Sequence, residues 1–565
     1  MGVRRAMEMV LAAANKDEGP LFTYGPLIHN KQVLELLESR GIKAIEDIRG
    51  MEKGVLLIRA HGIPPQQRQT LRSSPLKIID ATCPRVAHVQ ALIRYHTKKG
   101  YTPVIVGDQD HAEVIGLMGY AEGKAHVINS PSDVSTLPET DRLFLVAQTT
   151  QSEQLYNETA NAVKKRFPDA LVFDTICEST RERQREVKAL AEEVDGIVVV
   201  GGYHSGNSRR LAQVSESTGI PTFHIETEKD LVKEDFSSME VIGVTAGAST
   251  PNWMIKNVIK EIEAIRGRSE TLIGRWIKKG LEFLLLSNLM VALGAFSLSY
   301  ATNILLGARP GLLYPLLTLL YIYAMHVLNR FLDKGASTYN DPERAGFYRK
   351  YRIFLIITGI GAIIGALIIS LYLEKILFLA MGGLSLLGII YSIPIIPVNR
   401  RHLWRYSKIK DIPGSRTISE AIAWPLVITL LPLLKSFHSE WAAVIPSFFI
   451  VFSMAFIRSA FFDIFQVQGD LIVGVETLPI ILGEKRTMIL LKWIILSAGL
   501  VLFISPLFGL VSYFSLMLLI CLLILYISLT AYEHREIYPG LPLEYLVESA
   551  FIISGLLGVI WQMLQ

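Results

Sequence analysis

The pattern of apolar and polar positions changes near residue 270 of the chain. Before this point, apolar segments of strand length alternate with segments of helical periodicity, and charged and turn residues separate them. After it, apolar runs of about 20 residues follow one another, and a run of that length can cross the hydrocarbon core as a helix. The pattern predicts a water-soluble α/β part followed by an all-α membrane part.

The first part is predicted to consist of parallel α/β units. Short apolar segments alternate with helical ones, which is typical of parallel strands joined by crossover helices. Several of these segments end in small or polar residues, and ligands gather at the carboxyl ends of strands in open parallel sheets. We therefore expect one shared site there. The candidate strands are residues 56–60, 77–80, 102–108, 143–149, 170–175, 196–202 and 241–247.

The second part is predicted to contain nine membrane spans. Basic residues crowd the segment before the first span and the loops after spans two, four and six. This distribution predicts that the N-terminus and the α/β part are cytoplasmic and that the C-terminus lies outside. The expected spans are residues 281–305, 311–331, 352–373, 375–397, 417–435, 440–462, 487–508, 510–532 and 543–563.

Composition adds bounds to this picture. The 565 residues are too many for one ordinary domain, and their net charge of +4 indicates no particular partner, so no nucleic acid is expected. Three cysteines do not form a disulfide framework, and no signal peptide is recognised, so the thiols are expected to be reduced and able to bind metal. The expected domains are residues 1–268 and 281–565, joined by a basic linker, 269–280, near the anionic leaflet.

The candidate chemical groups of the first part are thiols, imidazoles, a carboxylate and hydroxyls near strand ends. Each has a structural alternative: the thiols suit a buried core, an isolated histidine is usually structural, and the hydroxyls suit a helix cap. The same hydroxyls and amides at a helix N-terminus also suit an anion. The main candidates are Cys83, Cys177, His29, His61, His111, Glu113, Ser205 and Asn207.

The combination of motifs is more specific than any one of them. YGPLIHN, IRAHG, DATCP, DHAEVIG, QTTQS, DTIC, SGNS and AGAST occur in this order. Residues 2–263 thereby resemble the LytB family of 4-hydroxy-3-methylbut-2-enyl diphosphate reductases. The resemblance implies three pseudo-equivalent α/β domains around a [4Fe–4S] cluster, with reduced ferredoxin or flavodoxin as the electron donor. It also implies conversion of the substrate to isopentenyl and dimethylallyl diphosphates.

Site residues follow from the same resemblance, motif by motif. Cys83 and Cys177 match cluster ligands. Glu113 matches the acid that relays a proton to the leaving hydroxyl, with Thr149 beside the substrate. Removal of a hydroxyl with two electrons does require an electron carrier, a Lewis acid and a proton donor. The implied substrate-binding residues are His29, His61, His111, Thr150, Ser205, Asn207 and Ser249.

The first part departs from the family in two places. The family has a serine pair where this chain has Ser205-Gly206, which removes one hydroxyl. The family also begins with a strand and a Cys-x-Gly-Val-x-Arg-Ala turn, whereas this chain begins Met1-Gly2-Val3. The domain is therefore expected to lack its first strand and its first cluster cysteine. A start codon assigned too late and a truncated, inactive domain are the two explanations.

The membrane part carries two polar sets near the predicted cytoplasmic ends of its spans. Asn329 and Asp333 lie one helical turn apart, and Asp463 and Asp470 lie nearly two turns apart. Polar groups in apolar spans are functional candidates, with interfacial carboxylates as the alternative. With the segment DIFQVQGDLIVGVETLPIILG, they resemble the UbiA-type intramembrane prenyltransferases over residues 275–565. The resemblance implies Mg²⁺ at these four side chains, bound to a prenyl diphosphate whose prenyl group passes to an aromatic or lipid acceptor.

Three expected acids of this second family are replaced, by Arg330, Ser337 and Gln466. The combined hypothesis is a bifunctional isoprenoid enzyme in the cytoplasmic membrane, in contact with membrane lipid. One alternative is a membrane-anchored binding or regulatory protein in which one or both sites are inactive. A transporter is a third possibility, although the sequence has no evident inverted repeat.

Overall fold

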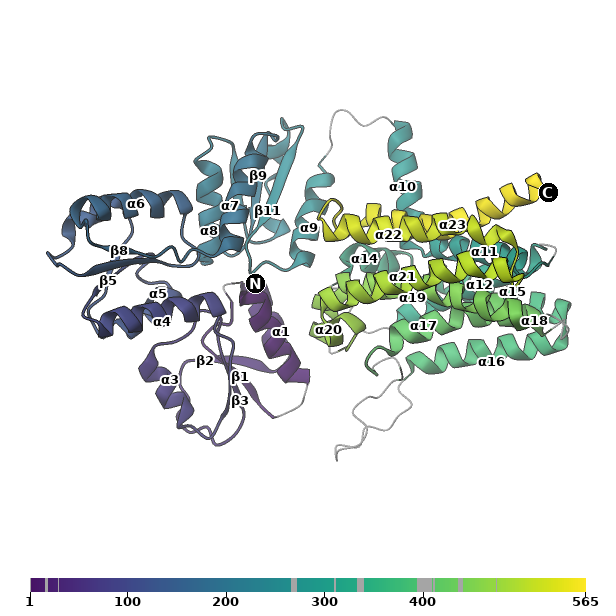
Figure 1. Cartoon of the computed structure of the whole chain (residues 1–565), viewed down its shortest axis with the longest axis horizontal. Helices are drawn as coiled ribbons and strands as arrows, with labels where there is room; N and C mark the ends of the chain where they lie inside the picture. The colour runs from purple at the N-terminus through teal and green to yellow at the C-terminus, as the bar shows by residue number, and fades with distance from the viewer. Residues whose placement is uncertain are drawn as a thin grey trace. The chain divides into compact units, whose positions relative to one another are not determined.

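The computed structural model divides the chain into two compact units, Met1–Ser269 and Glu270–Gln565. The first unit is purple to teal in Figure 1, and the second is teal to yellow. The structure describes residues 2–15, 19–28, 30–265, 272–308, 311–332, 340–393, 409, 412–434, 441–473 and 475–565.

The first unit contains three sheets, and all their hydrogen-bonded strand pairs are parallel. Their strand orders are β2-β1-β3-β4, β6-β5-β7-β8 and β10-β9-β11. The strands are β1 (Leu21–Tyr24), β2 (Ile42–Ile45), β3 (Val55–Ile58), β4 (Lys77–Asp80), β5 (Thr102–Val106), β6 (His126–Ile128), β7 (Leu143–Ala147), β8 (Leu171–Val172), β9 (Gly196–Val200), β10 (Thr222–Ile225) and β11 (Ile242–Ala246). The helices are α1 (Gly2–Asn15), α2 (Lys31–Ser39), α3 (Pro65–Arg72), α4 (Pro84–Lys98), α5 (Ala112–Met118), α6 (Glu153–Arg166), α7 (Glu178–Ala191), α8 (Gly206–Glu216) and α9 (Asn252–Glu263).

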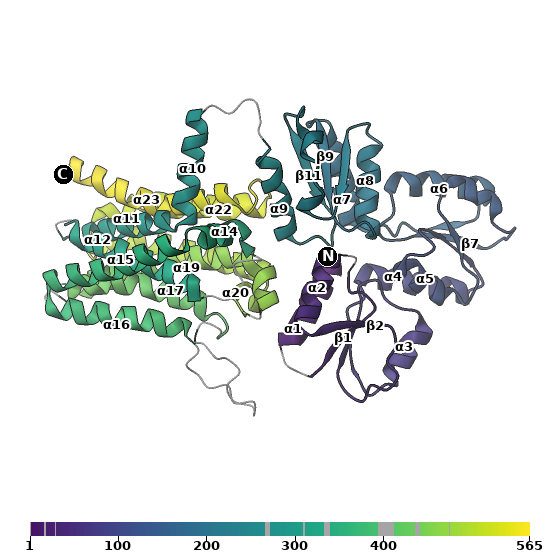
Figure 2. The same ribbon diagram turned by 180° about the vertical axis from the view of Figure 1, so that it is seen from behind.

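The third sheet shows why these apolar runs form parallel strands. Ile197 and Val199 of β9 pack with α7 and α8, whereas Val198 and Val200 pack with α9 on the other face. Figures 1 and 2 both show α9 on the side of β9 away from α8. A strand covered on both faces needs an apolar residue at every position, and β9 is buried throughout. The same holds for β3 and β7.

The parallel α/β prediction is confirmed, and all seven candidate strands are present. Four strands, β1, β2, β6 and β10, lay outside that prediction. Of these, β2, β6 and β10 are edge strands of three or four residues. They are only partly buried, so their sequences lack a continuous apolar run.

The second unit is all-helical. Eight of its described helices are long and apolar enough to cross a membrane, or nine spans if one bent pair counts as a span. This is a multi-pass membrane protein, as predicted. The helices are α10 (Leu272–Leu286), α11 (Leu289–Leu305), α12 (Leu313–Leu332), α14 (Pro342–Lys350), α15 (Arg352–Leu373), α16 (Lys375–Ser392), α17 (Ser415–Pro425), α18 (Leu431–Leu433), α19 (Trp441–Val473), α20 (Leu478–Leu482), α21 (Glu484–Ile504), α22 (Leu519–Glu533) and α23 (Leu541–Leu564), with a π-helical segment, Leu426–Leu430, before α18.

Two of the predicted spans need correction. The expected first span, 281–305, is not one straight helix, because α10 and α11 meet at 72°. At the bend, Asn288 has a left-handed φ of 61° and donates a 2.6 Å hydrogen bond to the Tyr348 hydroxyl. Asparagine tolerates this conformation better than most residues. The sixth span also continues past residue 462, because α19 runs to Val473 with residues 463 and 470 buried inside it.

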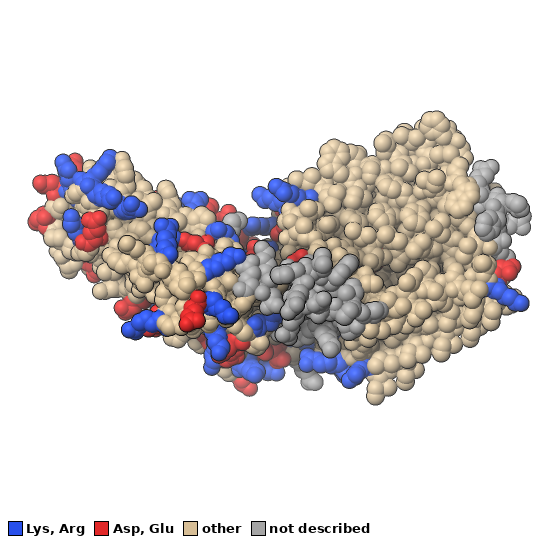
Figure 3. All heavy atoms as spheres, turned by 90° about the horizontal axis from the view of Figure 1, so that it is seen from below, with Lys and Arg blue, Asp and Glu red and all other residues tan. Residues whose placement is uncertain are grey.

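Close helix packing in this unit depends on small residues. Figure 3 shows a face of the unit on which nearly all atoms belong to uncharged residues, as expected of a surface in contact with lipid. Lipid gives no hydrophobic drive for helices to associate, so small residues that allow close approach carry the packing. Gly555 of α23 is such a residue, since a Cβ there would lie 2.7 Å from the Ser297 Cβ of α11.

Replacement of Gly555 should therefore loosen the bundle. Gly555→Leu is expected to lower the free energy of unfolding by at least about 1–3 kcal/mol, because the added side chain has no space against α11. Gly382→Leu is the matched control, since nothing lies within 4 Å of a Cβ at Gly382 in α16. Thermal unfolding in detergent would compare the two variants. Equal midpoints would contradict the packing argument.

Candidate active sites

A buried carboxyl group lies in the segment that joins β5 to β6, the first two strands of the middle sheet in chain order. Glu113, in the first turn of α5, is 2% exposed. The Thr149 backbone N–H donates to its Oε1 at 2.7 Å, and the Thr149 hydroxyl donates to its Oε2 at 2.9 Å. Burial raises the pKa of Glu113 from 4.5 to about 7, and the two hydrogen bonds from Thr149 lower it by less. Near neutral pH this carboxyl can therefore hold or release a proton.

Two of the three predicted histidines lie together beside this carboxyl. The His61 and His111 rings are 5.3 Å apart, edge to face. His111 caps α5, because its Nδ1 accepts a hydrogen bond from the Glu113 N–H at 3.2 Å. A Cβ at Gly206, the first residue of α8, would lie 3.2 Å from His111 Nε2. Segments that follow β3, β5 and β9, from all three sheets, thus meet at one place. His29 lies outside the described residues.

Unpaired hydrogen-bond donors lie at the start of α8 and in the segment after β11, whose Gly247 packs against Ser208 of α8. Ser205 caps the helix by accepting from the Ser208 N–H at 3.4 Å. Asn207 Nδ2 and Ser249 Oγ are buried and have no hydrogen-bond partner among the described residues. A buried donor without a partner is costly, so a ligand with several acceptor oxygens would relieve both. The positive end of the helix dipole favours an anionic ligand. Thr150 instead accepts a 2.9 Å hydrogen bond from Gln148.

The two cysteines of the first unit immediately precede helices. Cys83 precedes α4 and Cys177 precedes α7, and both are free and half-buried. The Cys177 N–H donates to the Thr149 carbonyl at 2.9 Å, which ties this thiol to the Glu113 site. A Cβ at Gly2 would lie 2.7 Å from Cys83 Sγ, so the start of α1 lies against the Cys83 thiol.

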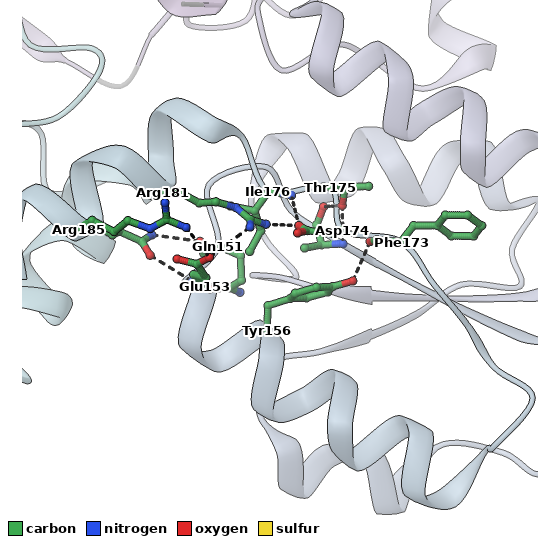
Figure 4. A network of polar contacts seen from close by, with 11 residues as sticks. Gln151, Glu153, Tyr156, Phe173, Asp174, Thr175, Ile176, Arg181 and Arg185 are labelled. Atoms are coloured by element: carbon green, nitrogen blue, oxygen red, sulfur yellow. Dashed lines mark hydrogen bonds and ion pairs between the residues drawn. The ribbon is translucent and has the colours of Figure 1, made fainter.

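A polar network holds the segment that leads into Cys177 (Figure 4). Arg181 forms ion pairs with Glu153, at 3.2 Å, and with Asp174. The Thr175 hydroxyl both accepts from the N–H and donates to the carbonyl of the last β7 residue, each at 2.7 Å. Side chains on α6 and α7 thus fix the residues directly before Cys177, so the network sets the position of the thiol.

The two thiols suit an iron–sulfur cluster in chemistry but not in number. The family resemblance requires three thiolates, and the described part of the first unit offers two. The third cysteine, Cys521, belongs to the membrane unit, where it is buried. No group of three metal-ligating side chains occurs among the described residues.

The acids of the membrane unit surround an arginine. Asp463, on α19, is 1% exposed and accepts a 2.6 Å hydrogen bond from the Thr417 hydroxyl. Arg416, on α17, has guanidinium nitrogens 3.8 Å from carboxylate oxygens of Asp463 and of Asp470. The same guanidinium donates to Gln466 at 2.9 Å. Three positions on one face of α19 therefore converge on one guanidinium.

The remaining predicted ligands are either elsewhere or outside the described residues. Asn329 accepts a 3.2 Å hydrogen bond from Ser392. Asn340 donates to Asp470 at 2.9 Å, and this contact was not predicted. Residues 333 and 337 are outside the described part of the chain. Both described acids of this set face Arg416, so the described residues alone do not form a Mg²⁺ site.

Arg416 is a functional candidate that sequence reasoning missed. A usable signal was present, because Arg416 and Glu420 are one helical turn apart at the start of an apolar span. Charged residues inside such spans usually have a partner or a function. The predicted fifth span began one residue later, at 417, which placed Arg416 in the loop.

These features define a parallel α/β protein with a shared polar site where the ends of its sheets meet. The chain belongs to the LytB protein family, whose model matches residues 1–263. A 4-hydroxy-3-methylbut-2-enyl diphosphate reductase of Opitutus terrae is 41% identical over 276 residues, 47% of this chain and 96% of that protein. The reductase of Geobacter sulfurreducens is 43% identical over 262 residues, 46% of this chain and 93% of that protein.

Solved structures match each unit separately. The E-1-hydroxy-2-methyl-but-2-enyl-4-diphosphate reductase of Plasmodium falciparum is 30% identical, with a TM-score of 0.45, over 46% of this chain and 83% of that one. A UbiA homolog from Archaeoglobus fulgidus, bound to GPP and Mg²⁺, is 17% identical, with a TM-score of 0.37, over 49% of this chain and 99% of that one.

The hydroxyl of Thr149 should tune the carboxyl beside it. Thr149→Val removes one hydrogen bond that lowers the pKa of Glu113, so this pKa should rise above about 7. Thr149→Ser keeps the hydroxyl and is the control. The infrared band of the protonated carboxyl, assigned by its loss in Glu113→Gln, would follow the titration. An unchanged titration in Thr149→Val would show that the bond has no such effect.

Proposed function

We propose that the first unit catalyses the reductive dehydroxylation of 4-hydroxy-3-methylbut-2-enyl diphosphate to isopentenyl and dimethylallyl diphosphates. One observation carries the proposal: a buried carboxyl with a pKa of about 7 lies where the three sheets meet. Membership of the LytB family supports it, and the relatives above carry the name of this reductase.

The residues divide the work between binding and proton transfer. The unpaired Asn207 and Ser249 donors would hold the diphosphate, with the imidazoles of His61 and His111 beside them. Glu113 would give its proton to the departing hydroxyl, which leaves as water. Cys83 and Cys177 would hold two positions of an iron–sulfur cluster, which when bound supplies the electrons. Reduced ferredoxin or flavodoxin would be the donor.

We infer a second activity for the membrane unit, the transfer of a prenyl group from a prenyl diphosphate to an acceptor within the membrane. The buried acids Asp463 and Asp470 beside Arg416, together with the motif resemblance, support this inference. Arg416 is the cation of this set, and a guanidinium binds phosphate oxygens well. We therefore expect Arg416 to contact the diphosphate directly. Dependence on Mg²⁺ stays a prediction. The basic loops favour the bacterial cytoplasmic membrane with the first unit in the cytoplasm.

The role of Glu113 can be tested in a chain that carries a cysteine directly before Met1. This cysteine can reach the Cys83 thiol, because Gly2 already lies against it. With a reducing dye, turnover should fall as pH rises through about 7, where Glu113 loses its proton. Glu113→Gln should keep iron and substrate binding but lose at least about 100-fold in kcat.

Glu139→Gln is the control for this substitution, because Glu139 is 82% exposed and forms an ion pair with Arg166, away from the Glu113 site. It should leave turnover unchanged. A protein that takes up no cluster even with the added cysteine, or equal turnover in Glu113→Gln, would refute the proposed reductase mechanism.

Binding of a prenyl diphosphate tests the second activity. Purified protein in lipid nanodiscs should bind labelled geranyl diphosphate more tightly with Mg²⁺ than with a chelator. Asp463→Asn should weaken this binding at least about tenfold, a loss of about 1.4 kcal/mol. Glu533→Gln is the control, since Glu533 is a half-exposed acid paired with Lys492. Failure to bind prenyl diphosphates of any chain length would favour the alternative of a binding or regulatory membrane protein.

A further inference from the structure

A second charged cluster lies inside the membrane unit and involves four helices. Arg458 of α19 donates to Glu548 of α23 and to Glu420 of α17, each at 2.7 Å. Ser459 donates to the other oxygen of Glu420 at 2.9 Å. His326 of α12 faces the same carboxylate, with Nε2 3.6 Å from Glu420 Oε1. The sequence analysis predicted no role for any of these residues.

This cluster lies directly beneath the acids around Arg416. Glu420 follows Arg416 by four residues on α17, and Arg458 precedes Asp463 by five on α19. At 1.5 Å per residue, both steps place the cluster about 6–8 Å farther along the helices. The two charged layers are therefore stacked on the same pair of helices. A prenyl diphosphate held at Arg416 would have its reacting carbon near the cluster.

One carboxylate oxygen of the cluster is unpaired. Arg458 binds Glu548 through Oε1, while Glu548 Oε2 is buried without a hydrogen-bond partner among the described residues. Glu548 is 2% exposed, and His326 faces Glu420 instead. Leaving a buried carboxylate oxygen without a donor is costly. The arrangement suits a bound molecule that donates a hydrogen bond.

The rest of the surroundings limits what this molecule can be. Two carboxylates face one guanidinium, so an acidic acceptor would be repelled. The rings of Trp424 and Phe462 lie 6.0 Å and 5.2 Å from the guanidinium carbon of Arg458, which gives the cluster an apolar border. A neutral, largely apolar molecule with one hydroxyl matches both features.

We propose that Glu548 is the general base for a neutral hydroxyl-bearing acceptor dissolved in the membrane. The inference rests on the proposed prenyl transfer and names its acceptor class. The acceptor oxygen attacks carbon 1 of the prenyl chain, and a new carbon–oxygen bond forms. The bond from carbon 1 to the diphosphate breaks, and its electron pair leaves with the diphosphate. The hydroxyl proton passes to Glu548 Oε2.

The first test compares Glu548→Gln with Glu533→Gln in nanodiscs. Glu548→Gln keeps the size and one hydrogen-bond acceptor but is far less basic. It should lower the kcat of transfer from geranyl diphosphate at least about 100-fold, the usual contribution of a general base. Its Kd for geranyl diphosphate should stay within about threefold of the wild type. Glu533→Gln should change neither value. Unimpaired transfer in Glu548→Gln would overturn the proposal.

The second test uses the wild-type protein and does not depend on how the variant folds. A long-chain phenol, an alcohol of the same length and the matching benzoic acid would be compared as acceptors. Transfer to the phenol or the alcohol, at least about tenfold faster than to the acid, is expected. Preference for the acid would overturn the proposal. If the wild-type protein does not bind geranyl diphosphate, the proposed prenyl transfer itself is refuted.

Discussion

A buried charge must be neutralised or hydrogen-bonded, and both units are organised around that constraint. In the first unit, Thr149 supplies both hydrogen bonds to Glu113, so strand β7 must end where α5 begins. In the second unit, Arg416 and Arg458 draw acids from α17, α19 and α23 into two layers. The helices that carry these groups cannot shift by a turn without leaving a charge unpaired.

The same constraint makes the unpaired groups informative. Most polar side chains near the two sites have partners, and Asn207 Nδ2, Ser249 Oγ and Glu548 Oε2 are among the buried exceptions in the described part of the chain. The first two are donors at the start of a helix or beside it, and they suit an anion. The third is an acceptor in an apolar bundle, and it suits a hydroxyl. The unpaired donors of the first unit thus favour an anionic ligand, whereas the unpaired acceptor of the second unit favours a ligand with a hydroxyl group.

Sequence patterns predicted the features that depend on local order. The continuous apolar run 196–202 identified β9, since a strand buried on both faces has no polar position to interrupt it. Edge strand β10 was not predicted, because its residues are partly exposed and its sequence therefore lacks a continuous apolar run. Motif order singled out Glu113 as a candidate, yet its pKa depends on burial by segments distant in sequence. Arg416 was missed because the predicted span began one residue after it, and its two acidic partners, about 50 residues away, share no local pattern with it.

The replacements in the membrane motif become coherent once Arg416 is included. An aspartate at position 466 would place a third carboxylate around one guanidinium, whereas Gln466 accepts a 2.9 Å hydrogen bond from Arg416 without adding charge. Arg330 brings a further cation to the neighbouring helix α12. Fewer acids and more guanidinium groups leave less negative charge for a metal ion to neutralise. In the proposed prenyl transfer, the diphosphate would then be held largely by arginine, whose planar donors match phosphate oxygens in pairs. The departures from the usual motif thus point to a site that needs less metal, and they do not by themselves indicate a lost one.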